Sequence, residues 1–154
     1  MIRVQEEDFD LGAELAALTR GKTSVGGLAV FVGLVRDMAG GDAVKAMTLE
    51  HYPAMTEAML ERIDAEAKQR WPLEDTLIVH RVGRLLPGEQ IVLVACTSAH
   101  RQAAFDGCQF LIDWLKTKAP FWKLEDGPIG AKWVEARASD DEAAKRWKTK
   151  TDAG

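Results

Sequence analysis

Residues 75–98, "DTLIVHRVGRLLPGEQIVLVACTS", form the centre of the fold that the sequence predicts. Two runs within this stretch, residues 75–83 and 90–98, are rich in Val, Ile and Leu and have the length of strands. Pro87-Gly88 lies between the two runs and suits the central positions of a type II turn, because proline sets φ and glycine accepts a positive φ. The stretch therefore predicts two strands joined by a tight turn.

Helical patterns flank these strands on both sides. Residues 53–71 and 99–118 predict amphipathic helices, because their apolar residues recur at intervals of three and four. Pro53 is acceptable in a first helical turn, whereas Pro120 prevents the second helix from continuing. The predicted buried stripes are Met55, Met59, Ile63 and Ala67 in the first helix, and Phe105, Cys108, Ile112 and Leu115 in the second.

The remaining elements are shorter. Residues 30–35 are apolar on both alternating faces, so they predict a buried strand from which Arg36 emerges. The glycine-rich residues 38–43 predict a flexible loop. A helix is also predicted within residues 8–21, strands at 44–52, 121–125 and 132–136, and a last helix at the capping box that runs from Ser139 to Glu142.

The order of these elements favours the α+β class. Strands and helices interleave, but not in the strict alternation of a doubly wound sheet. We therefore expect a two-layer α+β sandwich that forms a single domain over residues 1–154. Residues 139–154 are expected to be a short helix followed by a frayed polar tail.

Composition excludes several functional classes. The net charge of −4 disfavours general nucleic-acid binding, so any anion site must be local. No apolar run is long enough for a membrane span, and the acidic N-terminus does not resemble a secretion signal. Cys96 and Cys108 lie in apolar patterns, as reduced core thiols of a cytoplasmic protein do. The three histidines are too far apart in the sequence to indicate a zinc site.

A cluster of cations lies where the second long helix is expected to stop, in "KTKAPFWK", residues 116–123. Lysines in a last helical turn favour the helix dipole, which accounts for Lys116 and Lys118. Lys123 lies beyond Pro120, where the turn can bring it back towards Lys116. Ammonium groups that are held close together lower each other's pKa, so one can act as a base or nucleophile while the other binds an anion.

A second cationic pair, His100-Arg101, follows Thr97 and Ser98. Either hydroxyl can cap the helix that begins there, which would place the pair in the first helical turn. A helix N-terminus attracts anions. The alternative is that both side chains are simply solvated.

Several motifs together resemble the large, catalytic subunit of molybdopterin synthase. They are "FVGLVRD", "LEHYPAMTE", "IVHRVGRLLPGE", "TSAHRQAAF", "LKTKAPFWKLE" and "WVEA", in family order from about residue 25 to Trp147. The resemblance implies an α/β hammerhead layer with a small added antiparallel β subdomain, assembled as a homodimer. It places the family's substrate-pocket arginine at Arg36, its His-Arg pair at His100-Arg101, its catalytic lysines at Lys116 and Lys123, and a nearby acidic position at Glu125. Leu124 stands where relatives often have a further lysine.

The resemblance also implies a reaction and a partner. A small ubiquitin-like sulfur-carrier subunit brings a thiocarboxylate on its C-terminal glycine, and two sulfur transfers convert cyclic pyranopterin monophosphate to molybdopterin. This subunit is expected to need no metal and no organic cofactor. Arg36, His100 and Arg101 suit the binding of phosphate or carboxylate oxygens, and Glu125 belongs to the same substrate-binding group. Lys116 and Lys123 suit the stabilisation of developing charge, proton transfer or transient capture of the acyl group.

Two other functional hypotheses use the same residues. In the first, the cationic cluster belongs to a nucleotide- or RNA-binding module, in which Phe121 and Trp122 stack on bases. In the second, the chain is a non-catalytic partner subunit that only docks an acidic tail.

Overall fold

The computed structural model describes residues 1–39, 42–43, 45–118, 121–127, 130–134, 145 and 147. Its main sheet has the strand order β1-β6-β8-β2 and is mixed, because β1 runs parallel to β6 while the other pairs are antiparallel. The strands of this sheet are β1 (Ile2–Gln5), β6 (Leu73–Arg81), β8 (Gln90–Ser98) and β2 (Gly27–Leu34).

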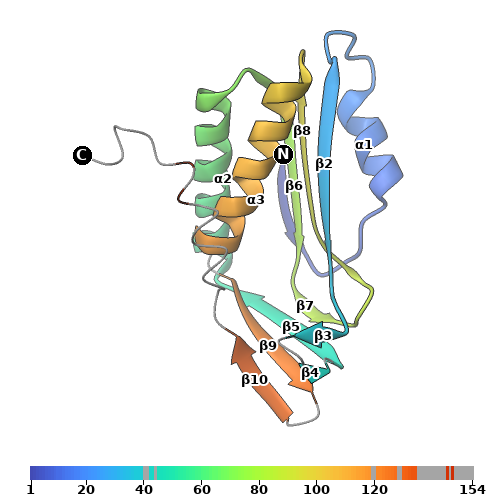
Figure 1. The fold of residues 1–154 in the computed structure, drawn as a ribbon, viewed down its shortest axis with the longest axis vertical. Helices are drawn as coiled ribbons and strands as arrows, with labels where there is room; N and C mark the ends of the chain where they lie inside the picture. The colour runs from blue at the N-terminus through green and yellow to red at the C-terminus, as the bar shows by residue number, and fades with distance from the viewer. Residues whose placement is uncertain are drawn as a thin grey trace, which may run out of the picture.

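A smaller antiparallel sheet lies at one end of the molecule, with the order β10-β9-β5-β7 (Figure 1). Its strands are β5 (Ala46–His51), β7 (Gly83–Leu85), β9 (Phe121–Gly127) and β10 (Gly130–Val134). Two very short strands, β3 (Met38–Ala39) and β4 (Asp42–Ala43), pair beside it. The predicted α+β class with a small antiparallel subdomain is therefore confirmed.

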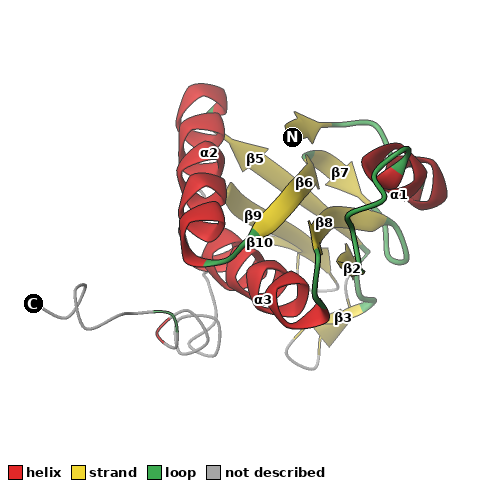
Figure 2. Ribbon diagram, turned by 90° about the horizontal axis from the view of Figure 1, so that it is seen from above, coloured by secondary structure: helices red, strands yellow, loops and turns green. Residues whose placement is uncertain are grey.

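Helices cover both faces of the main sheet. Figure 2 shows α2 (Pro53–Arg70) and α3 (Arg101–Lys118) side by side on one face and α1 (Leu11–Thr19) on the other. Successive side chains of β8 point to opposite faces of the sheet, which matches this arrangement. Val92, Val94 and Cys96 pack under α2 and α3, whereas Leu93 and Ala95 pack under α1. The central strands β6 and β8 are consequently buried on both faces.

The turn between β7 and β8 is the predicted type II turn. Gly88 has a φ of 90°, and the Glu89 N–H donates to the Leu86 carbonyl at 3.0 Å. A side chain would be strained at that φ, so glycine is required at this position.

Some sequence-based predictions were wrong. Among the described strands, β2 pairs with β8 alone and is an edge strand, so Val30, Phe31 and Leu34 are exposed rather than buried. Met55 and Phe105 are each 61% exposed, although the other members of their stripes are buried or half-buried. The predicted stripes were misplaced around each helix, because the buried faces include Leu60 in α2 and Phe110 and Leu111 in α3, which the stripes omitted.

Local signals were also misread or overlooked. Thr97 and Ser98 do not cap α3, because both lie in β8 and their hydroxyl groups bond to Asp75 and to the Pro72 carbonyl. The short strands β3 and β4 lie in what was predicted as a flexible loop, and strands β1 and β7 were not predicted at all. The predicted capping box of Ser139 and Glu142 lies outside the described residues.

Candidate active site

Arg36 lies at the end of β2, next to the small sheet. Val35, directly before it, is buried with Met47, Leu49 and Leu85, and two backbone hydrogen bonds hold Val35 against the β7–β8 turn at 2.9 and 2.8 Å. The position of the Arg36 backbone is therefore fixed by packing, while its side chain is exposed.

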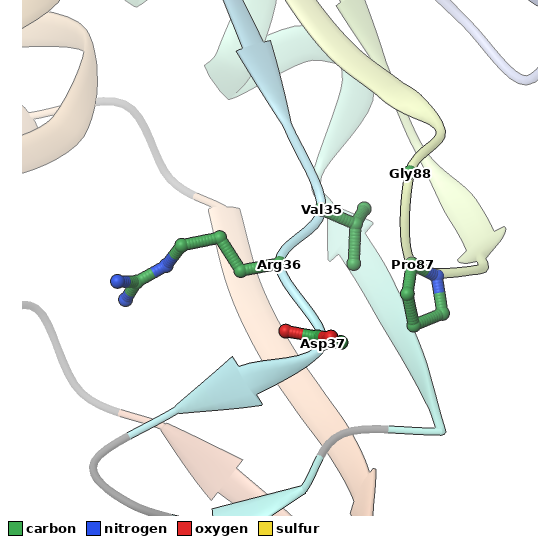
Figure 3. Close-up of a pocket in the computed structure, with 5 residues that line it drawn as sticks. All are labelled: Val35, Arg36, Asp37, Pro87 and Gly88. Atoms are coloured by element: carbon green, nitrogen blue, oxygen red, sulfur yellow. The ribbon is translucent and has the colours of Figure 1, made fainter.

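An open hollow of about 590 Å³ lies beside this arginine, lined by Val35, Arg36, Asp37, Pro87 and Gly88. Figure 3 shows the Arg36 guanidinium group extending away from Pro87 and Gly88. Asp37, Pro87 and Gly88 were not predicted as lining residues. Their only sequence signal is that they lie at a strand end and in a turn, where ligand contacts are common.

Lys116, like Arg36, lies at the end of the molecule that carries the small sheet. It belongs to the last turn of α3 and is exposed, whereas Leu111 and Leu115 anchor the opposite side of that helix in the core. Figure 1 shows that α3 starts at the far end of the main sheet and ends beside β9. The charge of Lys116 is thus held on a rigid element that points towards the small sheet.

Lys123 and Glu125 belong to β9, whose first residue follows α3 closely. Three residue steps separate Lys118 from Phe121, so the two backbones are at most about 11 Å apart. Within the sheet, Lys123 lies opposite Leu49 and Glu125 lies opposite Met47. Leu49 and Met47 belong to β5 and pack on Val35, which directly precedes Arg36. One strand, β5, therefore separates the backbone of β9 from the backbone of Arg36.

His100 and Arg101 do not join this group within one chain. They lie where β8 passes into α3, at the end of the molecule opposite the small sheet (Figure 1). Fifteen residues along α3 separate Arg101 from Lys116, which corresponds to about 22 Å. Both side chains are exposed.

Two glycines allow the backbone of residues 99–101 to pack closely against the start of β2. A Cβ at Gly26 would lie 2.0 Å from the Ala99 carbonyl oxygen, and a Cβ at Gly27 would lie 3.1 Å from the Arg101 Cα. The backbones can approach so closely only because neither residue has a side chain.

The cysteines take no part in this arrangement. Burial raises the pKa of the Cys108 thiol to about 11 and raises the pKa of the Cys96 thiol further still. Both thiols are therefore protonated at neutral pH and are poor nucleophiles. Among the described residues, no group of three His, Cys, Asp or Glu side chains is arranged to hold a metal ion. None of the helices in the described part of the chain combines the length and apolar character that a membrane span requires.

A mixed sheet covered by helices, with a small antiparallel sheet at one end, defines this chain as an α+β protein. Residues 4–118 match the family model described as "MoaE protein". The chain belongs to the family of molybdopterin synthase catalytic subunits, which convert cyclic pyranopterin monophosphate to molybdopterin in molybdenum cofactor biosynthesis.

Individual relatives are similar over nearly the whole chain. The molybdopterin synthase catalytic subunit of Pseudomonas aeruginosa is 58% identical over 146 residues, covering 95% of this chain and 97% of the relative. The subunit of the same name from Ralstonia nicotianae is 55% identical over 151 residues, covering 98% and 86%. The solved structure of the molybdopterin biosynthesis MoaE protein from Burkholderia ambifaria has a TM-score of 0.83 at 56% identity, covering 97% of this chain and 99% of that one.

Proposed function

We propose that this chain transfers sulfur from the C-terminal thiocarboxylate of a small ubiquitin-like carrier subunit to cyclic pyranopterin monophosphate. The observation that supports this proposal is that the end of β2, the last turn of α3 and strand β9, which carry Arg36, Lys116 and Lys123, all lie at the small-sheet end of the molecule. Both the cyclic phosphate and the carrier tail are anionic, so a local cationic site suits them despite the acidic protein.

Each residue has a role that its chemistry supports. Arg36 binds phosphate or carboxylate oxygens through its planar guanidinium group, and His100, Arg101 and Glu125 complete the substrate-binding group. Lys116 and Lys123 stabilise the negative charge that develops as the thiocarboxylate sulfur bonds to a substrate carbon. A carbon–oxygen bond of the substrate breaks in this step, and the leaving oxygen takes a proton. Water, or first the Lys116 amine and then water, cleaves the bond between the sulfur and the carrier's acyl carbon, so the sulfur stays on the substrate and the carrier is left with a carboxylate.

A second subunit of another kind is part of this proposal. The relatives are named catalytic subunits, which makes them one component of a larger enzyme. The carrier subunit is the component that supplies sulfur, and its tail enters the cationic end of this chain. A cytoplasmic location, where Cys96 and Cys108 remain reduced, fits this chemistry.

Two copies of the chain form a homodimer in this proposal. The edge strand β2 has the sequence "GLAVFVGL", which contains none of the charged residues that usually protect a sheet edge from pairing. Leu28, Val30, Phe31 and Leu34 are exposed along it, and a second copy would cover them. A two-fold axis beside β2 would place the His100-Arg101 end of one copy near the Lys116 end of the other.

Reconstitution tests the proposed reaction. The purified protein, a thiocarboxylated carrier subunit and cyclic pyranopterin monophosphate are mixed, and molybdopterin is measured. The matched control uses the same carrier with an ordinary C-terminal carboxylate, which should give no product. If the folded protein binds the thiocarboxylated carrier but forms no molybdopterin, it is a docking subunit. If the protein instead binds RNA with an affinity that falls steeply as salt rises, the hypothesis of an RNA-binding module gains support.

A further inference from the structure

Phe121 is the first residue of β9, and its ring stacks on two histidine rings. The His80 ring lies nearly parallel to it, with centroids 3.9 Å apart and an interplanar angle of 12°. The His51 ring lies 5.9 Å away at 30°. The three rings are called the ring stack below. Neither the cationic cluster nor the hollow accounts for it.

Each histidine of the ring stack is fixed to a different part of the fold. His80 belongs to β6 of the main sheet, is 5% exposed, and its Nδ1 lies 2.8 Å from the Arg81 carbonyl oxygen. Because a carbonyl only accepts, the Nδ1 atom carries the proton and the ring orientation is set. His51 ends β5 of the small sheet, and its Nδ1 lies 3.2 Å from the hydroxyl oxygen of Thr56, a buried residue in the first turns of α2.

The ring stack therefore joins β9 to the main sheet. The backbone of β9 pairs with β5 and β10, and both of these strands belong to the small sheet. Lys116, in contrast, is carried by α3, which packs on the main sheet. The contact between Phe121 and His80 crosses from one sheet to the other, only two residues before Lys123.

We propose that Phe121 and His80 are positioning residues, which hold Lys123 at the correct place relative to Lys116 and thereby set the rate of turnover. This inference rests on the function proposed above. A displacement of about 1 Å at a reacting group can cost about a hundredfold in rate, so a small shift of β9 is sufficient. Phe121 itself does not touch the reacting atoms in this proposal.

Phe121→Leu tests the inference, because leucine keeps an apolar side chain but removes the stacking ring. We expect kcat to fall at least tenfold, while KM for the pterin and Kd for the carrier subunit change less than twofold. Phe121→Tyr keeps a stacking ring and should retain at least half of the wild-type kcat. Ile78→Val is the matched control for lost packing in β6, since Ile78 is fully buried two residues from His80. It should lower thermal stability without changing kcat.

Two measurements report on the ring stack without using activity. Stacking on Phe121 should shift the NMR signals of the His80 ring protons upfield, and the shift should vanish in Phe121→Leu. Amide hydrogen exchange should become faster at residues 121–127 of that variant and stay unchanged in α3. If Phe121→Leu proves insoluble, His51→Leu removes the half-buried ring instead, with an expected threefold loss in kcat.

The inference is overturned if Phe121→Leu loses the upfield shift but keeps its kcat within twofold of wild type. It is also overturned if exchange in β9 does not change, because β9 is then positioned by other contacts. An inactive wild type with a normal upfield shift and normal exchange would instead refute the proposed sulfur transfer, so the two failures are distinguishable.

Discussion

Lys116 is exposed on the last turn of α3, while the opposite side of the helix is buried. Lys116→Ala should reduce molybdopterin formation at least a hundredfold, because it removes a charge proposed to stabilise the transition state. The free energy of unfolding should change by only a few tenths of a kcal/mol, as for other surface residues near a helix end. The matched control is Lys68→Ala, which removes a last-turn lysine from α2 and should leave activity unchanged. Near-normal turnover by folded Lys116→Ala would remove this lysine from the catalytic group.

Arg36 is proposed to bind substrate rather than to perform chemistry. Arg36→Lys keeps the positive charge but loses the planar two-point contact with an oxyanion. KM for the pterin should rise about tenfold, whereas kcat should remain within about threefold of wild type. Steady-state kinetics over a range of pterin concentrations measures both constants. A collapsed kcat with an unchanged KM would show that Arg36 acts in the chemical step.

Cys108 should make stability depend on pH in the alkaline range. Burial raises the pKa of its thiol from 9.0 to about 11, so the folded state favours the protonated form. The resulting stabilisation is complete below pH 9 and is lost as the pH rises from 9 to 11, because the unfolded thiol ionises first. Its size is about 1.4 kcal/mol per pH unit in this window. Urea unfolding at pH 8 and pH 10 measures it, and Cys108→Ala should show a shallower pH dependence than wild type.

At the scale of single elements, α2 shows how burial divides a helix. Leu60 is fully buried, whereas Met55 is 61% exposed on the same helix. Leu60→Ala should lower the free energy of unfolding by 2–5 kcal/mol, because it leaves a cavity under the helix. Met55→Ala should change it by less than about 0.5 kcal/mol. Urea denaturation of both variants tests this contrast, and equal losses would mean that the described packing of α2 is wrong.

The strand β2 shows the limit of a local pattern. Its apolar alternation is the same as that of a strand in the middle of a sheet, and the prediction of a buried strand followed from it. The neighbours of a strand are chosen by long-range pairing, and β2 has β8 as its one partner among the described strands. The pattern alone could not indicate that one edge of β2 has no partner strand in the part of the chain that the structure describes.

At the scale of the whole molecule, the separation of His100-Arg101 from Lys116 predicts an active site shared between two subunits. Dimers of two inactive variants, Lys116→Ala and Arg101→Ala, are allowed to exchange subunits. Half of the resulting dimers carry both variants, and in a shared-site arrangement one of their two sites is intact. Activity should then return to roughly a quarter of wild type.

The same mixing experiment separates the alternatives. If each site lies within one chain, every site remains defective and no activity returns. If Arg101→Ala is fully active by itself, the His100-Arg101 pair does not belong to the site.

The sequence by itself determined the two long helices, the central strands, the β7–β8 turn and the α+β class. These follow from periodicity and from proline and glycine, which act over a few residues. It also determined the family, through motifs in family order. Only the tertiary structure decided that β2 is an edge among the described strands and that Phe121 meets His80. Each of these depends on contacts between residues far apart in the chain, and no local pattern encodes them.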